Sequence, residues 1–128
     1  KIVILSNVIL KHPLTITDVE RVGISHLTSE DIEMAKAEEK KWKLIAKLKK
    51  EGDRVIASVK PEMVSLYHPL ANITGATNAI TYLCDLAGPI TLIGAGAGKV
   101  ETGFSILIDL INIDLRKSLA SVEVSQSY

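Results

Sequence analysis

The sequence has 128 residues, 47% of them hydrophobic, with 15 basic and 15 acidic side chains and a formal net charge of zero. This composition suffices for a globular domain with a hydrophobic core and excludes a largely disordered chain. Because a neutral chain has no basic surplus for phosphates or anionic lipids, we expect neither nucleic acid nor a membrane as a partner.

The first apolar run covers residues 2 to 10, and Ser6, Asn7 and Lys11 make it too short for a membrane span. Its β-branched residues favour a buried strand, whereas its length favours a buried helix, so both remain open. The sequence enters this run directly from Lys1, without an initiator Met or the charged lead of a signal peptide. We therefore expect the protein to have a further segment upstream.

A short extended segment within residues 17 to 27 precedes a helix that we expect to be capped at Thr28 or Ser29. Acidic residues fill the first turn of this helix and lysines follow its end, as the helix dipole favours. Its few apolar positions indicate a single narrow buried face. These positions are Ile32, Met34 and Ala35.

Residues 42 to 49 alternate between apolar side chains and lysines, which predicts a strand with one face in water. Residues 50 to 53 (KEGD) have the composition of a turn, and residues 54 to 59 form the expected return strand. We predict an irregular segment from residue 61 to residue 70. Two further apolar strands are expected on either side of residues 85 to 89, where Gly-Pro provides turn chemistry.

The last predicted element is a helix that includes residues 104 to 115 and is apolar around most of its circumference. Its polar side chains form one narrow stripe, consisting of Ser105, Asp109, Asn112 and Arg116. Such a helix must be buried on several sides, and the predicted strands can cover only one. We therefore expect a neighbouring domain or subunit beside it.

These elements predict an α/β fold of α+β-like character, with a mostly antiparallel or mixed sheet and helices packed on it. Residues 94–128 are expected to form a glycine-rich turn and a C-terminal helix that packs elsewhere.

Three glycines, Gly94, Gly96 and Gly98, alternate with alanines between the last strand and the last helix. Backbone amides at a helix N-terminus can bind a polar or anionic group closely. The spacing differs from the dinucleotide motif G-x-G-x-x-G and from a P-loop. From spacing alone, a turn that only permits close helix packing is equally consistent.

The cysteine and histidines offer no evident catalytic or metal site. Cys84 lies in an apolar segment, which favours a small buried side chain and a reducing compartment such as the cytoplasm. His12, His26 and His68 lack the spacing of metal ligands, so we expect no metal site in this chain. His68 precedes a proline, which favours a role in a turn.

A longer pattern resembles the C-terminal part of homoserine dehydrogenase. The pattern consists of HPLANITGATNAI, two strands, GAGAG with Thr102 four residues later, and an apolar helix with Asp109. The resemblance extends back through WKLIAKL, TSEDIEMA and VERVGI to Lys1 and covers essentially the whole chain. It implies that the family's nucleotide-binding domain and the first portion of its substrate domain lie upstream. It further implies that residues 1–93 are a fragment of the substrate-binding and oligomerisation domain, and that the helix within residues 94–128 returns to pack on the nucleotide-binding domain.

The resemblance implies an oxidoreductase that uses NADP or NAD to interconvert L-aspartate 4-semialdehyde and L-homoserine, in the biosynthesis of threonine, methionine and isoleucine. It implies that Gly96, Gly98 and Thr102 lie at the coenzyme and that Lys1 is the catalytic lysine. It also implies a homo-oligomer such as a homodimer, and metal ligands, if the complete enzyme has them, upstream of this chain.

Lys1 is chemically suited to donate a proton to the alkoxide that forms when hydride reaches an aldehyde carbon. The alternative for a terminal lysine is a solvated tail. The sequence departs from the family pattern in residues 99 to 104, so the shape of the turn near the coenzyme and the choice between NAD and NADP stay open. An isolated fragment would be inactive without the coenzyme domain.

Two other functions remain open from the sequence. The order strand, helix, strand, strand over residues 19 to 59 is typical of small non-catalytic domains that bind regulatory amino acids. The chain could also serve only as a dimerisation module, through pairing of an exposed sheet face with a second copy.

Overall fold

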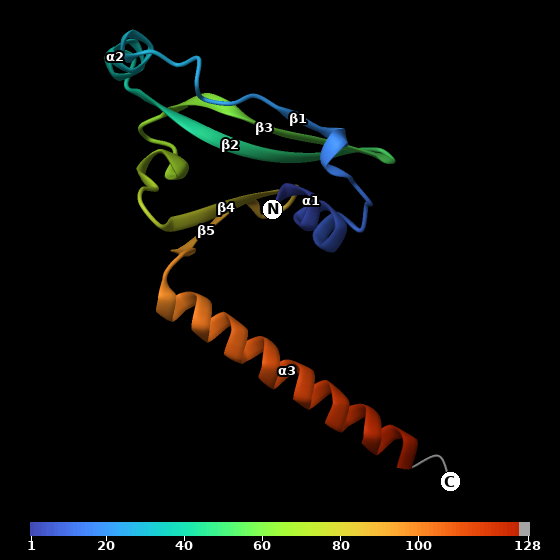
Figure 1. Ribbon diagram of the computed structural model, residues 1–128. Coiled ribbons are helices and arrows are strands. Elements are labelled where there is room, and N and C mark those ends of the chain that lie inside the picture. The colour runs from blue at the N-terminus through green and yellow to red at the C-terminus, as the bar shows by residue number, and fades with distance from the viewer. Residues whose placement is uncertain (126–128) are drawn as a thin grey trace. The chain divides into compact units, whose positions relative to one another are not determined.

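The computed structural model describes residues 1–125, with side chains as far as residue 117. The chain divides into two compact units, Lys1–Asn72 and Ile73–Tyr128 (Figure 1). The expected division between residues 93 and 94 concerned packing against an upstream domain and stays a prediction. Residues 126–128 of the expected C-terminal segment lie outside the described part.

The first apolar run is helical. Helix α1 (Ile2–Leu5) continues into a wider π-helical turn, η1 (Ser6–Leu10), which ends where Lys11 adopts a left-handed conformation with φ of 53°. Ile2 and Ser6 lie one turn apart and are both buried. The Ser6 hydroxyl donates a 3.0 Å hydrogen bond to the His12 carbonyl, which satisfies the buried polar group.

The expected extended segment and capped helix are both present. After the short 3₁₀ turn η2 (Ile16–Asp18), strand β1 (Val19–Arg21) leads towards helix α2 (Ser29–Ala37). Thr28 caps α2: its hydroxyl accepts from the Asp31 amide at 3.2 Å, and its own amide donates to the Asp31 carboxylate at 2.8 Å. Of the three apolar positions expected to be buried, only Ala35 is buried; Ile32 and Met34 are exposed.

Strands β2 (Lys40–Glu51) and β3 (Arg54–Ser65) form the expected hairpin around a two-residue turn, in which Gly52 has φ of 60°. The strand order is β1-β3-β2, with β1 parallel to β3 and β2 antiparallel to it (Figure 1). The predicted mixed sheet with helices is therefore confirmed.

The prediction of an irregular segment from residue 61 was wrong for its first part. β3 continues through Pro61 to Ser65, and the 3₁₀ turn η3 (Pro69–Asn72) follows only later. Because β1 pairs with β3 only at residues 57 to 59, β3 has a single neighbour beyond Val59. A proline without an amide hydrogen is tolerated at such an edge position.

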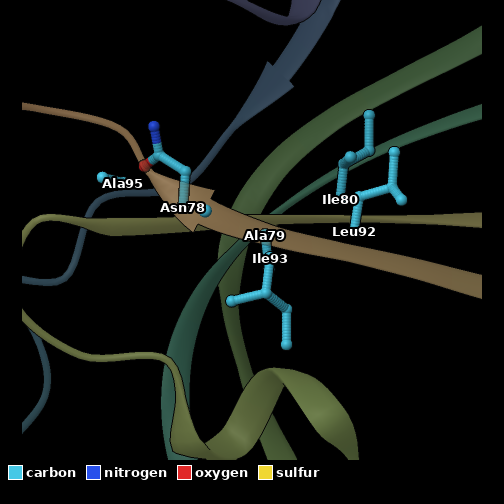
Figure 2. A pocket seen from close by; sticks show the side chains of 7 residues that line it. Asn78, Ala79, Ile80, Leu92, Ile93 and Ala95 are labelled. Atoms are coloured by element: carbon cyan, nitrogen blue, oxygen red, sulfur yellow. The ribbon is translucent and has the colours of Figure 1, made fainter. Parts of the chain in front are cut away.

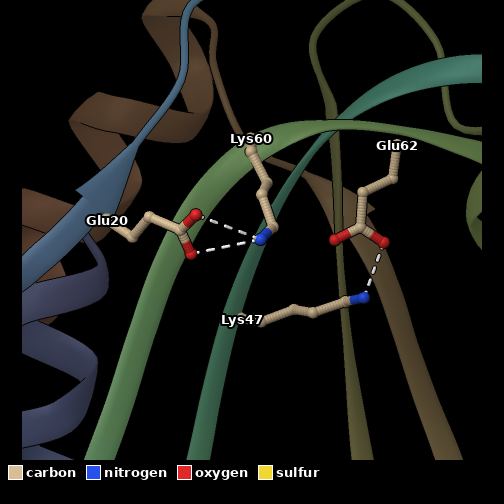
Figure 3. A network of polar contacts seen from close by, with 4 residues as sticks. All are labelled: Glu20, Lys47, Lys60 and Glu62. Atoms are coloured by element: carbon tan, nitrogen blue, oxygen red, sulfur yellow. Dashed lines mark hydrogen bonds and ion pairs between the residues drawn. The ribbon is translucent and has the colours of Figure 1, made fainter.

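The two faces of this sheet differ in character. On one face, Val19 and Ala57 form a small core with Ile2 and Leu14. The other face is charged and includes Lys47, one of the lysines that the alternation placed in water (Figure 3). There Lys60 pairs with Glu20 at 3.1 Å and Lys47 with Glu62 at 2.6 Å, in contacts too exposed to stabilise the sheet strongly.

The second unit begins with an antiparallel hairpin of strands β4 (Thr77–Cys84) and β5 (Gly88–Ala95). Both predicted strands are thus confirmed, although Pro89 belongs to β5 rather than to the turn. The hydroxyls of Thr81 and Thr91 lie 2.9 Å apart across the pair. The expectation of a buried Cys84 was wrong: this residue ends β4 beside the turn and is exposed.

Helix α3 (Lys99–Ser125) completes the second unit. Every side chain that the structure describes on this helix, residues 99–117, is exposed, including Phe104, Leu107 and Ile111. The predicted burial on several sides is therefore not provided by the described residues. Within the part of the chain that the structure describes, no helix is long and apolar enough to span a membrane.

Candidate functional site

The glycine-rich turn joins strand β5, which ends at Ala95, to helix α3, which begins at Lys99. The Gly96 amide donates a 2.9 Å hydrogen bond to the Ala76 carbonyl, one step beyond the last strand pair. The start of the turn is therefore fixed to the hairpin.

The three glycines differ in what lies against their α-carbons. Nothing lies within 4 Å of the position that a β-carbon on Gly94 would take. A β-carbon on Gly96 would overlap the Asn78 side chain, and one on Gly98 would overlap the Glu101 carboxylate. Gly98 also has φ of 155°, in the range that favours glycine. Contacts and backbone conformation within this chain therefore favour glycine at positions 96 and 98, without any ligand.

Asn78 stands at one end of a shallow hollow on the hairpin (Figure 2). The hollow is lined by Asn78, Ala79, Ile80, Leu92, Ile93, Gly94 and Ala95. Asn78 provides its only polar side chain. An apolar group could pack in the hollow and a polar group could hydrogen-bond to Asn78, but the lining contains no acid, base or nucleophile.

The first turn of α3 presents free amide groups. The Thr102 amide donates a 3.0 Å hydrogen bond to the Gly98 carbonyl, which is the first such bond of the helix. The preceding amides, at residues 99 to 101, have no acceptor within the helix. These amides and the exposed Thr102 can bind a polar or anionic group at the positive end of the helix.

Three of the four predicted site residues are close neighbours in the sequence, and the fourth lies in the other unit. Gly96, Gly98 and Thr102 lie within the turn and the first helical turn of the second unit. Lys1 belongs to the first unit, where it is exposed and its carbonyl accepts a 3.0 Å hydrogen bond from the Leu5 amide. The roles of all four residues stay predictions.

The histidines and acidic residues give no sign of a metal site. Among the residues that the structure describes, no three His, Cys, Asp or Glu side chains are grouped so that they could hold a metal ion. His68 has a local role, because its Nδ1 atom accepts a 3.2 Å hydrogen bond from the Leu70 amide. This is the turn role that the following proline favoured.

Comparison with known proteins identifies the family. The family model described as homoserine dehydrogenase matches residues 1–111. The chain belongs to the homoserine dehydrogenase family. The match includes both units and the first part of α3.

Named homoserine dehydrogenases agree with this assignment in sequence. The NAD(+)-dependent homoserine dehydrogenase of Pseudomonas canavaninivorans is 46% identical over 114 residues, which is 88% of this chain and 32% of that protein. The homoserine dehydrogenase of Methanocaldococcus jannaschii is 40% identical, with the same two coverages. The chain therefore spans about a third of the length of these relatives.

Solved structures agree in fold. The S. aureus homoserine dehydrogenase at pH 6.5 superimposes with a TM-score of 0.81 and 37% identity, over 89% of this chain and 29% of that one. The enzyme from Thiobacillus denitrificans gives a TM-score of 0.81 at 30% identity, over 88% of this chain and 26% of that one. The α+β-like architecture is thus that of part of a homoserine dehydrogenase.

The contacts of two residues with the glycine-rich turn were not predicted from the sequence. Asn78 covers Gly96 from the neighbouring strand, and only the strand register, which places Asn78 opposite Gly94, reveals this contact. Glu101 could have been noticed, because an acidic residue in a first helical turn often folds back towards the N-cap.

Proposed function

We propose that the complete protein to which this chain belongs is an NAD- or NADP-dependent homoserine dehydrogenase. It would reversibly reduce L-aspartate 4-semialdehyde to L-homoserine, within the biosynthesis of threonine, methionine and isoleucine. The observation that carries this proposal is the family match over residues 1–111, supported by relatives named for that activity. A non-catalytic amino-acid-binding domain would not account for this match.

The turn and first helical turn suit one wall of a coenzyme site. Gly96 and Gly98 leave backbone at the surface, and Thr102 adds a hydroxyl beside free amide groups. In this proposal the nicotinamide ring of the coenzyme, which carries the hydride, lies against Gly98. The upstream domain would bind the rest of the coenzyme.

Lys1 would supply the proton in the reduction. Its ammonium group can stabilise the negative charge that develops on the aldehyde oxygen and then protonate it. The coenzyme, when bound, would supply the hydride for the new C–H bond, and the lysine would supply the proton that completes the hydroxyl. Any metal ligands of the complete enzyme would come from its upstream part.

The exposed apolar surface of α3 supports a further part of the proposal. We place this surface against another domain of the complete protein, because at least nine large apolar side chains of α3 are exposed in this chain. We also propose a homo-oligomer located in the cytoplasm. Sedimentation of the complete protein as a monomer at all concentrations would contradict the oligomer.

Activity of the complete protein tests the proposal directly. Oxidation of NADH or NADPH in the presence of L-aspartate 4-semialdehyde is expected for the wild type. Lys1→Arg, which keeps the charge but cannot donate a proton near neutral pH, should lower kcat by about 10²- to 10⁴-fold with little change in coenzyme affinity.

Lys36→Ala is the matched control, because Lys36 is an exposed lysine of the same unit and, among the described residues, its ion pair is with Glu33 alone. It should leave kcat unchanged. Inactivity of the wild-type protein with both coenzymes would refute the proposed function. Full activity of Lys1→Arg would refute only the role of Lys1.

A further inference from the structure

The Glu101 carboxylate occupies a particular place in the turn. Glu101 is the third residue of α3, and its carboxylate folds back over the α-carbon of Gly98, where a β-carbon would otherwise stand. The positive end of the helix dipole favours an anionic side chain there. The carboxylate therefore lies next to the glycine that we place at the nicotinamide.

This carboxylate has unused acceptor capacity. Its side chain is exposed, and in the described part of the chain no hydrogen bond or ion pair involves its carboxylate oxygens. An ionised carboxylate has about four lone-pair positions and no donor. Glu101 can thus accept hydrogen bonds from a ligand without breaking contacts within the protein.

Few side chains in this segment can accept a hydrogen bond from a ligand. Among the side chains of residues 94 to 102, only those of Glu101 and Thr102 contain an acceptor atom, and Lys99 is only a donor. The Gly98 carbonyl already accepts from the Thr102 amide. A ligand group with N–H donors that lies against Gly98 would therefore meet Glu101 as its strongest acceptor.

We propose that Glu101 accepts a hydrogen bond from the carboxamide NH₂ group of the nicotinamide coenzyme and so fixes the orientation of the ring. The inference rests on the proposed function, and it assigns a role to a residue outside the glycine pattern. The carboxamide is the N–H donor group of the nicotinamide ring. Its NH₂ and the carboxylate have complementary hydrogen-bonding chemistry.

A coenzyme analogue provides a binding test that does not depend on turnover. The 3-acetylpyridine analogues of NAD⁺ and NADP⁺ replace the carboxamide by a methyl ketone, which has no N–H group. Dissociation constants for coenzyme and analogue are measured with the complete protein by calorimetry. The wild type should prefer the natural coenzyme by about tenfold or more, as expected for a hydrogen bond to a charged acceptor.

Three variants make the test specific. Glu101→Ala should lose the preference, because affinity for the natural coenzyme falls while affinity for the analogue stays the same. Glu101→Gln keeps an acceptor oxygen and should retain part of the preference. Glu30→Ala removes an exposed first-turn carboxylate of α2, in the other unit, and should change neither constant.

The outcomes separate this inference from the proposed function. An undiminished preference in Glu101→Ala, or no preference in the wild type, overturns the role of Glu101 while coenzyme binding stands. A loss of homoserine affinity alone would assign the carboxylate to the substrate ammonium group and also overturn it. Absence of binding of either coenzyme by the wild type would overturn both proposals.

Discussion

At the scale of single residues, Gly96 and Gly98 differ in which side chain occupies the position that a β-carbon would take. Gly96 meets Asn78 of the adjacent strand, including its β-carbon, which would lie 2.8 Å from an added methyl group. The atoms nearest to a β-carbon on Gly98 belong to the end of the flexible Glu101 side chain, which can move. Replacement of Gly96 should therefore affect the hairpin, whereas Gly98 is constrained mainly by its backbone conformation.

Gly96→Ala should destabilise the β4–β5 hairpin by about 1–3 kcal/mol, the usual cost of an inserted methyl group in a close contact. Hydrogen exchange of the hairpin amides in the complete protein measures this local free energy. The control is Gly94→Ala, which has open space around the new methyl group and should not destabilise the hairpin.

The partner residue gives a second check. Asn78→Gly removes the side chain that the new methyl group would meet, so the double variant should recover part of the lost free energy. Equal losses in the single and double variants would show that the contact with Asn78 is not the cause.

At the scale of elements, the sequence predicted those features that depend on neighbours along the chain. The cap of α2 and the β2–β3 turn each involve residues a few positions apart, Thr28 with Asp31 and Gly52 with its flanking strands. Residues 2 to 10 and Pro61 were different. Whether residues 2 to 10 form a helix or a strand, and whether the chain at Pro61 is a strand or irregular, depends on distant parts of the chain, such as Ala57 for Ile2.

The cap of α2 should produce a measurable pH dependence. Hydrogen bonds from the Thr28 amide and then the Thr28 hydroxyl hold the pKa of the Asp31 carboxyl below its usual value. Since the pKa is lowered in the folded state, the cap stabilises α2 fully above the unfolded pKa. This stabilisation is lost as the pH falls through the lowered folded value.

An NMR titration of the Thr28 amide should therefore show a transition below the ordinary aspartate pKa. Asp31→Asn should abolish this transition, and Thr28→Ala should move it to higher pH because the hydroxyl donor is lost. A wild-type midpoint at the ordinary value, unchanged in Thr28→Ala, would contradict the capping geometry.

At the scale of the whole molecule, the amount of buried apolar surface is small. The buried hydrophobic residues among the described side chains are Ile2, Leu14, Val19, Ala35, Ala57 and Ala71. Three of these six are alanines, in a sequence that is 47% hydrophobic. Most of the apolar side chains of α3 are exposed, so this helix gains little tertiary stabilisation from the described residues.

Substitutions on opposite sides of α3 test whether the complete protein buries it. Leu107 lies opposite the polar stripe formed by Ser105, Asp109, Asn112 and Arg116. Leu107→Gln should destabilise the complete protein by about 2 kcal/mol, because it places an amide in an apolar contact. Asn112→Gln, on the stripe, should change the free energy of unfolding by less than about 0.5 kcal/mol.

Thermal denaturation of the complete protein gives both values. Similar small effects of the two substitutions would show that α3 remains exposed in the complete protein. That result would remove the support for a domain packed on this helix, but it would leave the family assignment unchanged.

The sequence by itself determined the capped helix, the hairpin with its charged face, the glycine-rich turn and the apolar character of α3. Each of these features follows from the spacing of residues that are near one another in the sequence. Only the tertiary structure decided that residues 2 to 10 are helical, that β3 passes through Pro61, and that Asn78 covers Gly96. These outcomes depend on which distant segments pair or pack together, and local spacing does not encode that pairing.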